Sequence, residues 1–221
     1  MNFRPISRPL LGAALLVPAL GTTIFQNWPG GGAPAQALYA ATKLFTFVLP
    51  LAFVRWEKPV CPSGKSLSLG ALLGLVISGA IFALFASPFG DTIRAAAPSV
   101  LSKVTELGIA EHFVAFAIII SLFHTGLEEF YWRGLVFTGL RQYTSAPKAH
   151  AIAGIGFALH HIAILDQFFL LHHAIWMSAA VGIGGVLWSL LAARDRSLLS
   201  PWLSHIIVDV ALMIIGYNLI F

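Results

Sequence analysis

The feature that most restricts this chain is a series of long apolar stretches separated by short polar loops. A transmembrane helix needs about 20 predominantly apolar residues to cross the hydrocarbon core of a bilayer. Only 10% of the 221 residues are charged and 58% are hydrophobic, whereas a soluble domain carries about 25% charged residues. The sequence therefore predicts an all-α polytopic membrane protein with about seven transmembrane helices, near residues 10–25, 35–54, 66–86, 109–140, 149–165, 175–193 and 199–221.

Two of these stretches are not simple spans. Residues 10–25 follow a short basic start, as in a signal peptide, but no small-x-small cleavage site follows, and we expect a first transmembrane helix. Residues 109–140 are too long for one straight span, so we expect a break or bend near Thr125-Gly126 or at Gly134. The mixed residues 87–108 predict a loop with a surface helix.

The basic residues of the loops lie mostly on one side under a seven-span count, which by the positive-inside rule predicts a cytoplasmic N-terminus and an outer C-terminus. The net charge of +4 therefore reflects topology. No basic stripe with interleaved aromatic residues is present, so no nucleic-acid partner is expected. Cys61 is the only cysteine, which excludes an intrachain disulfide and a Cys-rich metal site. Without a repeat or soluble domain, residues 1–221 predict a single transmembrane domain.

Two adjacent carboxylates, Glu128 and Glu129, and one arginine, Arg133, interrupt the fourth apolar stretch. An isolated ionised carboxylate is costly to bury, so such groups are kept in apolar segments mainly where they pair or act. On a helix Glu129 and Arg133 are four residues apart and share a face, with the acid N-terminal to the base. Glu128 is rotated by about 100° from Glu129. We therefore expect the Glu129 carboxylate to be neutralised and Glu128 to serve chemistry.

Three pairs of ionisable groups occur in other spans or at their ends. The fifth span contains His160 and His161, and the last contains His205 and Asp209, which are four apart and share a helical face. His172-His173 lies at an expected outer loop and receives little weight. A lone histidine in a helix is more often structural, but several ionisable groups on three apolar spans favour a functional site.

This inventory allows more than one chemistry. A buried glutamate near neutral imidazoles could act as a general base on water, and a second imidazole could stabilise an oxyanion. Glu128, His161 and His205 could instead hold a catalytic zinc ion, although no His-Glu-x-x-His motif is present. No Gly-x-Ser-x-Gly motif supports a serine mechanism, and the aspartates do not predict a paired-aspartate site.

Taken in order, Glu128-Glu129-x-x-x-Arg133, Phe157-x-x-x-His161 and His205-x-x-x-Asp209 resemble the three-motif signature of the CPBP family. This family comprises CAAX prenyl endopeptidases and bacteriocin-processing or bacteriocin-immunity membrane proteins, also called Abi. The resemblance covers a core of about residues 109–221. The Phe-x-x-x-His spacing selects His161 over His160.

The resemblance implies a glutamate-type intramembrane endopeptidase with its active site between helices four, five and seven. It implies that Glu128, assisted by His161, activates water, that Glu129 pairs with Arg133, and that His205 and residue 209 stabilise the oxyanion. The family more often has Asn where this chain has Asp209. An ionised Asp209 cannot donate a hydrogen bond, so it would have to be protonated or orient His205. No cofactor is expected, with zinc as the alternative.

The expected partners are a membrane-associated peptide or protein substrate and the lipid bilayer. The short loops resemble a prokaryotic member in the plasma (inner) membrane, for which prenylated substrates are not expected. The alternatives are a non-catalytic immunity or scaffold protein of the same fold and a small proton-coupled transporter that uses Glu128 and the histidines as a relay.

Overall fold

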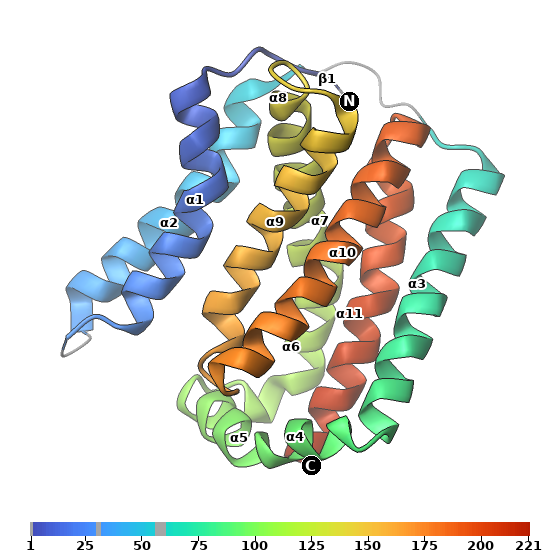
Figure 1. Ribbon diagram of the computed structural model, residues 1–221. Helices are drawn as coiled ribbons and strands as arrows, with labels where there is room; N and C mark the ends of the chain where they lie inside the picture. Colours follow the sequence, from blue (N-terminus) through green and yellow to red (C-terminus); the bar gives the residue numbers. More distant parts are fainter. Residues whose placement is uncertain (1, 30–31, 56–60) are drawn as a thin grey trace. The chain divides into compact units, whose positions relative to one another are not determined.

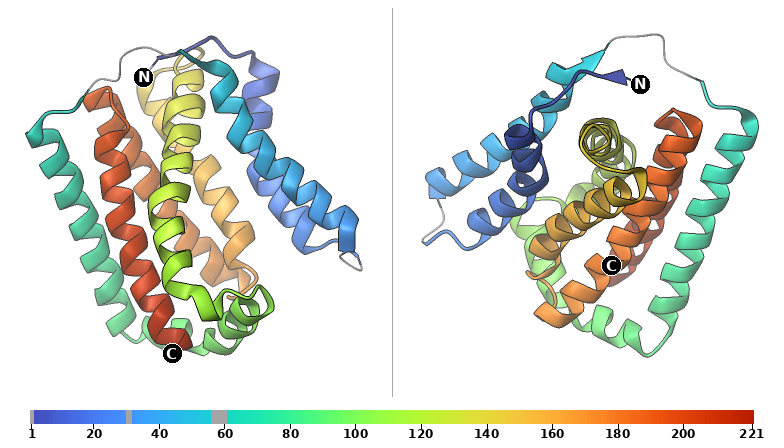
Figure 2. Two further views of the ribbon diagram at one scale, coloured as in Figure 1. Left: turned by 180° about the vertical axis from the view of Figure 1, so that it is seen from behind. Right: turned by 45° about the horizontal axis from the view of Figure 1, so that its top comes forward.

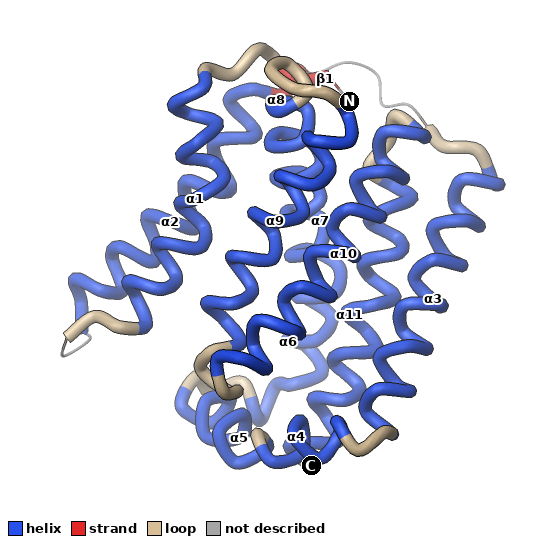
Figure 3. Tube along the Cα trace, viewed as in Figure 1, coloured by secondary structure: helices blue, strands red, loops and turns tan. Residues whose placement is uncertain are grey.

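The computed structural model describes residues 2–29, 32–55 and 61–221, and these are almost entirely helical (Figure 3). Seven helices are long and apolar enough to cross a membrane, which confirms the predicted all-α architecture. The expected surface helix at residues 87–108 is also present, as two short helices. The long helices are α1 (Arg8–Gln26), α2 (Gly32–Phe53), α3 (Gly64–Ala86), the helix Ala110–Leu140, α9 (Ala146–Leu165), α10 (Leu171–Asp195) and α11 (Leu199–Ile220), and the two short ones are α4 (Phe89–Ala95) and α5 (Ala97–Glu106).

The sequence suggested a break or bend near Thr125-Gly126 or at Gly134. The fourth span is not broken at Thr125-Gly126. Thr125–Glu129 (α7) is α-helical, and π-helical turns occur on both sides of it. After η1 (Ala110–His112) and α6 (Phe113–Ile119), the first π segment is η2 (Ile120–His124). The second is η3 (Phe130–Phe137), which contains Gly134 and leads into α8 (Thr138–Leu140). The irregularity is therefore a change of helical winding, of the kind often found at functional sites.

The chain folds as two compact units. The first comprises the described part of Met1–Val60 together with Glu128–Leu198, and the second comprises Cys61–Leu127 and Leu199–Phe221. The prediction of a single domain stays a prediction. The predicted topology also stays a prediction. Lys58, a basic residue of the loop after the second span, lies outside the described residues.

Glycines allow the helices of the first unit to pack closely. A Cβ on Gly154 of α9 would lie 2.9 Å from the Gly182 carbonyl oxygen of α10, and one on Gly182 would lie 3.1 Å from the Gly154 carbonyl oxygen. Such close approach is how helices associate where lipid removes the hydrophobic driving force. α9 and α10 accordingly lie side by side (Figure 1, Figure 2). A short antiparallel ladder joins β1 (Asn2–Phe3) to β2 (Val54–Arg55) in the same unit.

A proline in α1 fixes how that helix meets η3. Pro18 has no backbone N–H, so the carbonyl of Ala14, one turn earlier, loses its normal donor. The Tyr131 hydroxyl donates to this carbonyl oxygen at 2.7 Å. In a bilayer no water can satisfy such a group, so the tyrosine ties the motif-bearing helix to α1.

The second unit pairs α3 with α11, which lie side by side (Figure 1, Figure 2). A Cβ on Gly74 would lie 2.8 Å from the Ser204 carbonyl oxygen. On another face of α11, the Trp202 indole N–H donates to the Leu122 carbonyl oxygen at 3.0 Å and to Thr125 Oγ1 at 3.1 Å. These contacts hold α11 between α3 and the first half of the fourth span.

Candidate active site

Glu129 and Arg133 form the predicted ion pair, with Arg133 Nη1 donating to Glu129 Oε1 at 3.0 Å. Both side chains are only 1% exposed. Two charges so deeply buried lose much hydration, and removing either partner would leave the other uncompensated. The pair therefore fixes this part of the helix rather than presenting a charge to a substrate.

The Arg133 guanidinium also lies over two aromatic rings from neighbouring helices. Its Cζ is 4.7 Å from the centre of the Phe157 ring and 5.1 Å from that of Trp188. A Cβ on Gly185 would lie 3.1 Å from Arg133 Nη2 and 3.0 Å from Phe157 Cδ1, so the glycine makes room for this stack. Cation–π contacts of this kind stabilise a desolvated arginine.

Trp188 and Gly185 were not foreseen as part of the site. The only local signal was the glycine-rich run Gly182-x-Gly184-Gly185 in the sixth span, which indicates close backbone approach but not its partner.

His161 is oriented by its own helix. Its Nδ1 lies 2.9 Å from the Phe157 carbonyl oxygen, and its ring meets the Phe157 ring edge-on at 4.5 Å. Because a carbonyl oxygen can only accept, Nδ1 must carry the proton, and in the neutral imidazole Nε2 then bears the lone pair. Phe157 thus contacts both His161 and Arg133, which explains why the phenylalanine belongs to the motif.

His160 has a different role. Its side chain is buried, and its Nδ1 lies 3.2 Å from the Pro18 carbonyl oxygen in α1. This contact ties α9 to α1, as the tyrosine ties η3 to α1. The choice of His161 over His160 as the residue with a chemical role stays a prediction.

Glu128 is half-buried, in contrast to its fully buried neighbour. Its carboxylate lies within electrostatic range of the Arg133 guanidinium and of the His160 imidazole. The first unit therefore gathers one carboxylate, one compensated ion pair and two histidines from the end of α7, η3 and α9.

His205 and Asp209 are brought together within the second unit. His205 Nε2 lies 3.7 Å from Asp209 Oδ1, longer than a hydrogen bond. The side chain of His205 is 5% exposed and that of Asp209 is 15% exposed. The Asp209 carboxylate therefore lies beside the His205 ring on the same helix.

The six predicted site residues thus fall into two groups, with four in the first unit and two in the second. That both groups line one pocket stays a prediction. Within the described ranges, no three His, Cys, Asp or Glu side chains gather as metal ligands. The zinc alternative, whose ligands belong to both units, stays untested. At the start of α10, His172 is exposed and His173 is half-buried, with their Nε2 atoms 3.1 Å apart.

Comparison with known proteins connects these motifs to one family. Residues 110–211 match the family model described as type II CAAX prenyl endopeptidase Rce1-like. Neither a curated protein nor a solved structure matches the chain. The matched region spans all six predicted site residues, from Glu128 to Asp209. Over residues 110–211, the chain is therefore similar to the Rce1-like type II CAAX prenyl endopeptidases.

Proposed function

We propose that this protein is an intramembrane endopeptidase that hydrolyses a peptide bond of a membrane-associated substrate. The observation that carries the proposal is the asymmetry of the two adjacent carboxylates. Glu129 is buried and compensated by Arg133, while Glu128 is half-buried and within electrostatic range of His160 on α9. The match of residues 110–211 to the Rce1-like family model supports the same proposal.

In the proposed reaction the Glu128 carboxylate takes a proton from water, and the water oxygen attacks the carbonyl carbon of the scissile bond. His161 assists through Nε2, which its contact with the Phe157 carbonyl leaves as the basic nitrogen. When the carbon–nitrogen bond breaks, the proton passes to the leaving amine. Each role follows from the charge or tautomer that the local packing gives to the residue.

The negative charge that develops on the carbonyl oxygen requires a donor, and we assign this role to His205. An imidazole N–H can donate to the oxyanion, and the Asp209 carboxylate lies 3.7 Å from His205 Nε2. An ionised Asp209 would then act on His205 rather than on the substrate. This assignment requires that His205 and Glu128 reach the same substrate bond.

The test compares membranes from cells that produce the wild type, Glu128→Gln or His161→Ala, with Glu106→Gln as a matched control at an exposed carboxylate. Peptides with new termini are quantified by mass spectrometry at equal amounts of folded protein. We expect a set of cleavage products in the wild type and the control that both site variants lack. Retained cleavage in Glu128→Gln would exclude the mechanism.

The remaining outcomes separate the alternative functions. Loss of folded protein in Glu128→Gln would favour a non-catalytic immunity or scaffold protein in which the glutamate ties helices together. If the wild type in liposomes takes up a solute together with protons and Glu128→Gln does not, the result would favour a transporter.

A further inference from the structure

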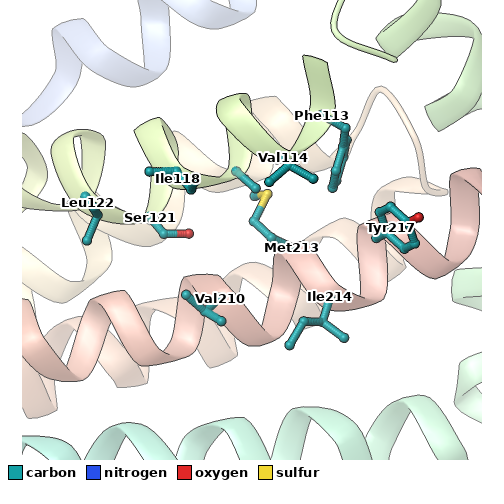
Figure 4. Close-up of a pocket in the computed structure, with 10 residues that line it drawn as sticks. Phe113, Val114, Ile118, Ser121, Leu122, Val210, Met213, Ile214 and Tyr217 are labelled. Carbon is teal, nitrogen blue, oxygen red and sulfur yellow. The ribbon is translucent and has the colours of Figure 1, made fainter. Parts of the chain in front are cut away.

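An apolar groove runs between the start of the fourth span and the end of α11, within the second unit (Figure 4). It has a volume of about 370 Å³, within the range of small-molecule sites. We call it the α6–α11 groove. Its lining is apolar apart from one serine and the tyrosine at its end, and comprises Phe113, Val114, Ala117, Ile118, Ser121, Leu122, Val210, Met213, Ile214 and Tyr217.

Small side chains on the fourth span form the floor of the groove. Ala117 and Ser121 are four residues apart and face Val210, Met213 and Ile214 of α11. The Ser121 side chain is buried, and its hydroxyl has no hydrogen-bond partner among the described residues. The two helices are therefore separated here by space that no side chain of this unit fills.

The length of the groove matches one leaflet of a bilayer. From Phe113 to Leu122 the helix rises about 14 Å, and half of the hydrocarbon core is about 15 Å thick. The groove also starts where both spans end, because Phe113 is near the beginning of one and Tyr217 near the end of the other. A transmembrane peptide would need the full thickness, so the dimensions favour a lipid chain.

A second, more polar cavity continues the groove at the span ends. It shares Phe113, Val114, Ile118 and Tyr217 with the groove and adds Glu111 and His112. An aromatic cluster borders it, with the Tyr217 and Phe221 rings 4.8 Å apart. Tyrosine rings are typical of the headgroup level of a membrane.

The charge at this end is not compensated. In the preceding loop region Arg94 pairs with Asp91 at 2.7 Å and Lys103 pairs with Glu106 at 3.0 Å. Glu111 is exposed and makes no ion pair within the described part of the chain. A carboxylate at the headgroup level is complementary to an ammonium group.

We propose that the α6–α11 groove and its polar end bind one phospholipid with an amine-bearing headgroup. One acyl chain lies in the groove over Ala117, and the ammonium group contacts Glu111. This site uses none of the residues of the proposed peptidase, so either proposal can fail without the other.

The test measures phospholipids retained by the purified full chain by native mass spectrometry, with phosphatidylethanolamine and phosphatidylglycerol of identical acyl chains as probes. Ala117→Trp fills the groove, and Ala83→Trp on an exposed position of α3 is the matched control. We expect Ala117→Trp to lower phosphatidylethanolamine binding about tenfold and the control to leave it unchanged. Glu111→Gln should abolish the preference over phosphatidylglycerol while both lipids still bind.

Equal lipid retention in Ala117→Trp and the wild type, or equal binding of both lipids by the wild type, would overturn the proposal. A co-purified peptide in place of lipid would also overturn it. Should Ala117→Trp not fold, Ala117→Leu fills less of the groove, and Glu111→Gln alters only an exposed side chain. Both variants still test the assignment.

Discussion

Two pairs of ionisable residues share the same helical spacing but differ in how tightly they are held. Glu129 and Arg133 form an ion pair at 3.0 Å, and both side chains are almost fully buried. The arginine also stacks on Phe157 and Trp188. His205 and Asp209, in the other unit, are 3.7 Å apart and the carboxylate is partly exposed. Spacing alone therefore does not decide the role of a pair. The first has the packing of a structural ion pair, and the second has room to change its charge.

The largest effect is expected from Arg133→Met, which leaves the Glu129 carboxylate buried without its partner. Breaking a buried ion pair costs about 3–5 kcal/mol, measured as the free energy of unfolding in detergent mixtures. Lys103→Met removes one partner of the exposed pair with Glu106 and should cost at most about 1 kcal/mol. The double variant Glu129→Gln/Arg133→Met should recover part of the loss. Equal costs for Arg133→Met and Lys103→Met would remove the contrast between buried and exposed pairs.

A smaller loss is expected when the stack around Arg133 is disturbed. In Gly185→Ala the new methyl group would press on Arg133 Nη2 and the Phe157 ring, and overpacking of this kind costs about 1–3 kcal/mol. Gly12→Ala in α1 is the control, because a Cβ there meets nothing within 4 Å, and it should not destabilise the protein. If both variants melt at the wild-type temperature, the guanidinium is less confined than its contacts indicate.

The tie between Tyr131 and Ala14 gives a third test of how tightly the first unit is held. Tyr131→Phe leaves the Ala14 carbonyl oxygen without a donor, at a cost of about 1–3 kcal/mol. Pro18→Ala restores the backbone N–H that this carbonyl would otherwise accept, so Tyr131→Phe should cost less in that background. A double-mutant cycle measures the difference. Additive effects would show that the hydroxyl does not replace the missing helix donor.

The sequence predicted the features that are set by residues close to one another along a single helix. The seven spans follow from apolar length, and the Glu129–Arg133 contact follows from four-residue spacing, because both are set within a single segment. The contacts of Trp188 and Gly185 with Arg133 join different helices, and no periodicity specifies which glycine faces which side chain. The π-helical turns were not predicted, because the expected break at Thr125-Gly126 was inferred from the length of a regular α-helix. The distance between the two motif groups also depends on how different helices pack, so residue spacing along one helix does not predict it.

The smallest effect on stability is expected at the looser pair. Asp209→Asn keeps the shape of the side chain and removes a contact longer than a hydrogen bond, so the free energy of unfolding should fall by less than about 1 kcal/mol. Cleavage products should persist, since the Asn amide can itself donate to an oxyanion. His205→Ala, by contrast, should abolish them in folded protein. If Asp209→Asn abolished cleavage as well, the negative charge at 209 would be needed to hold His205 protonated, and the looser pair would be the more sensitive one.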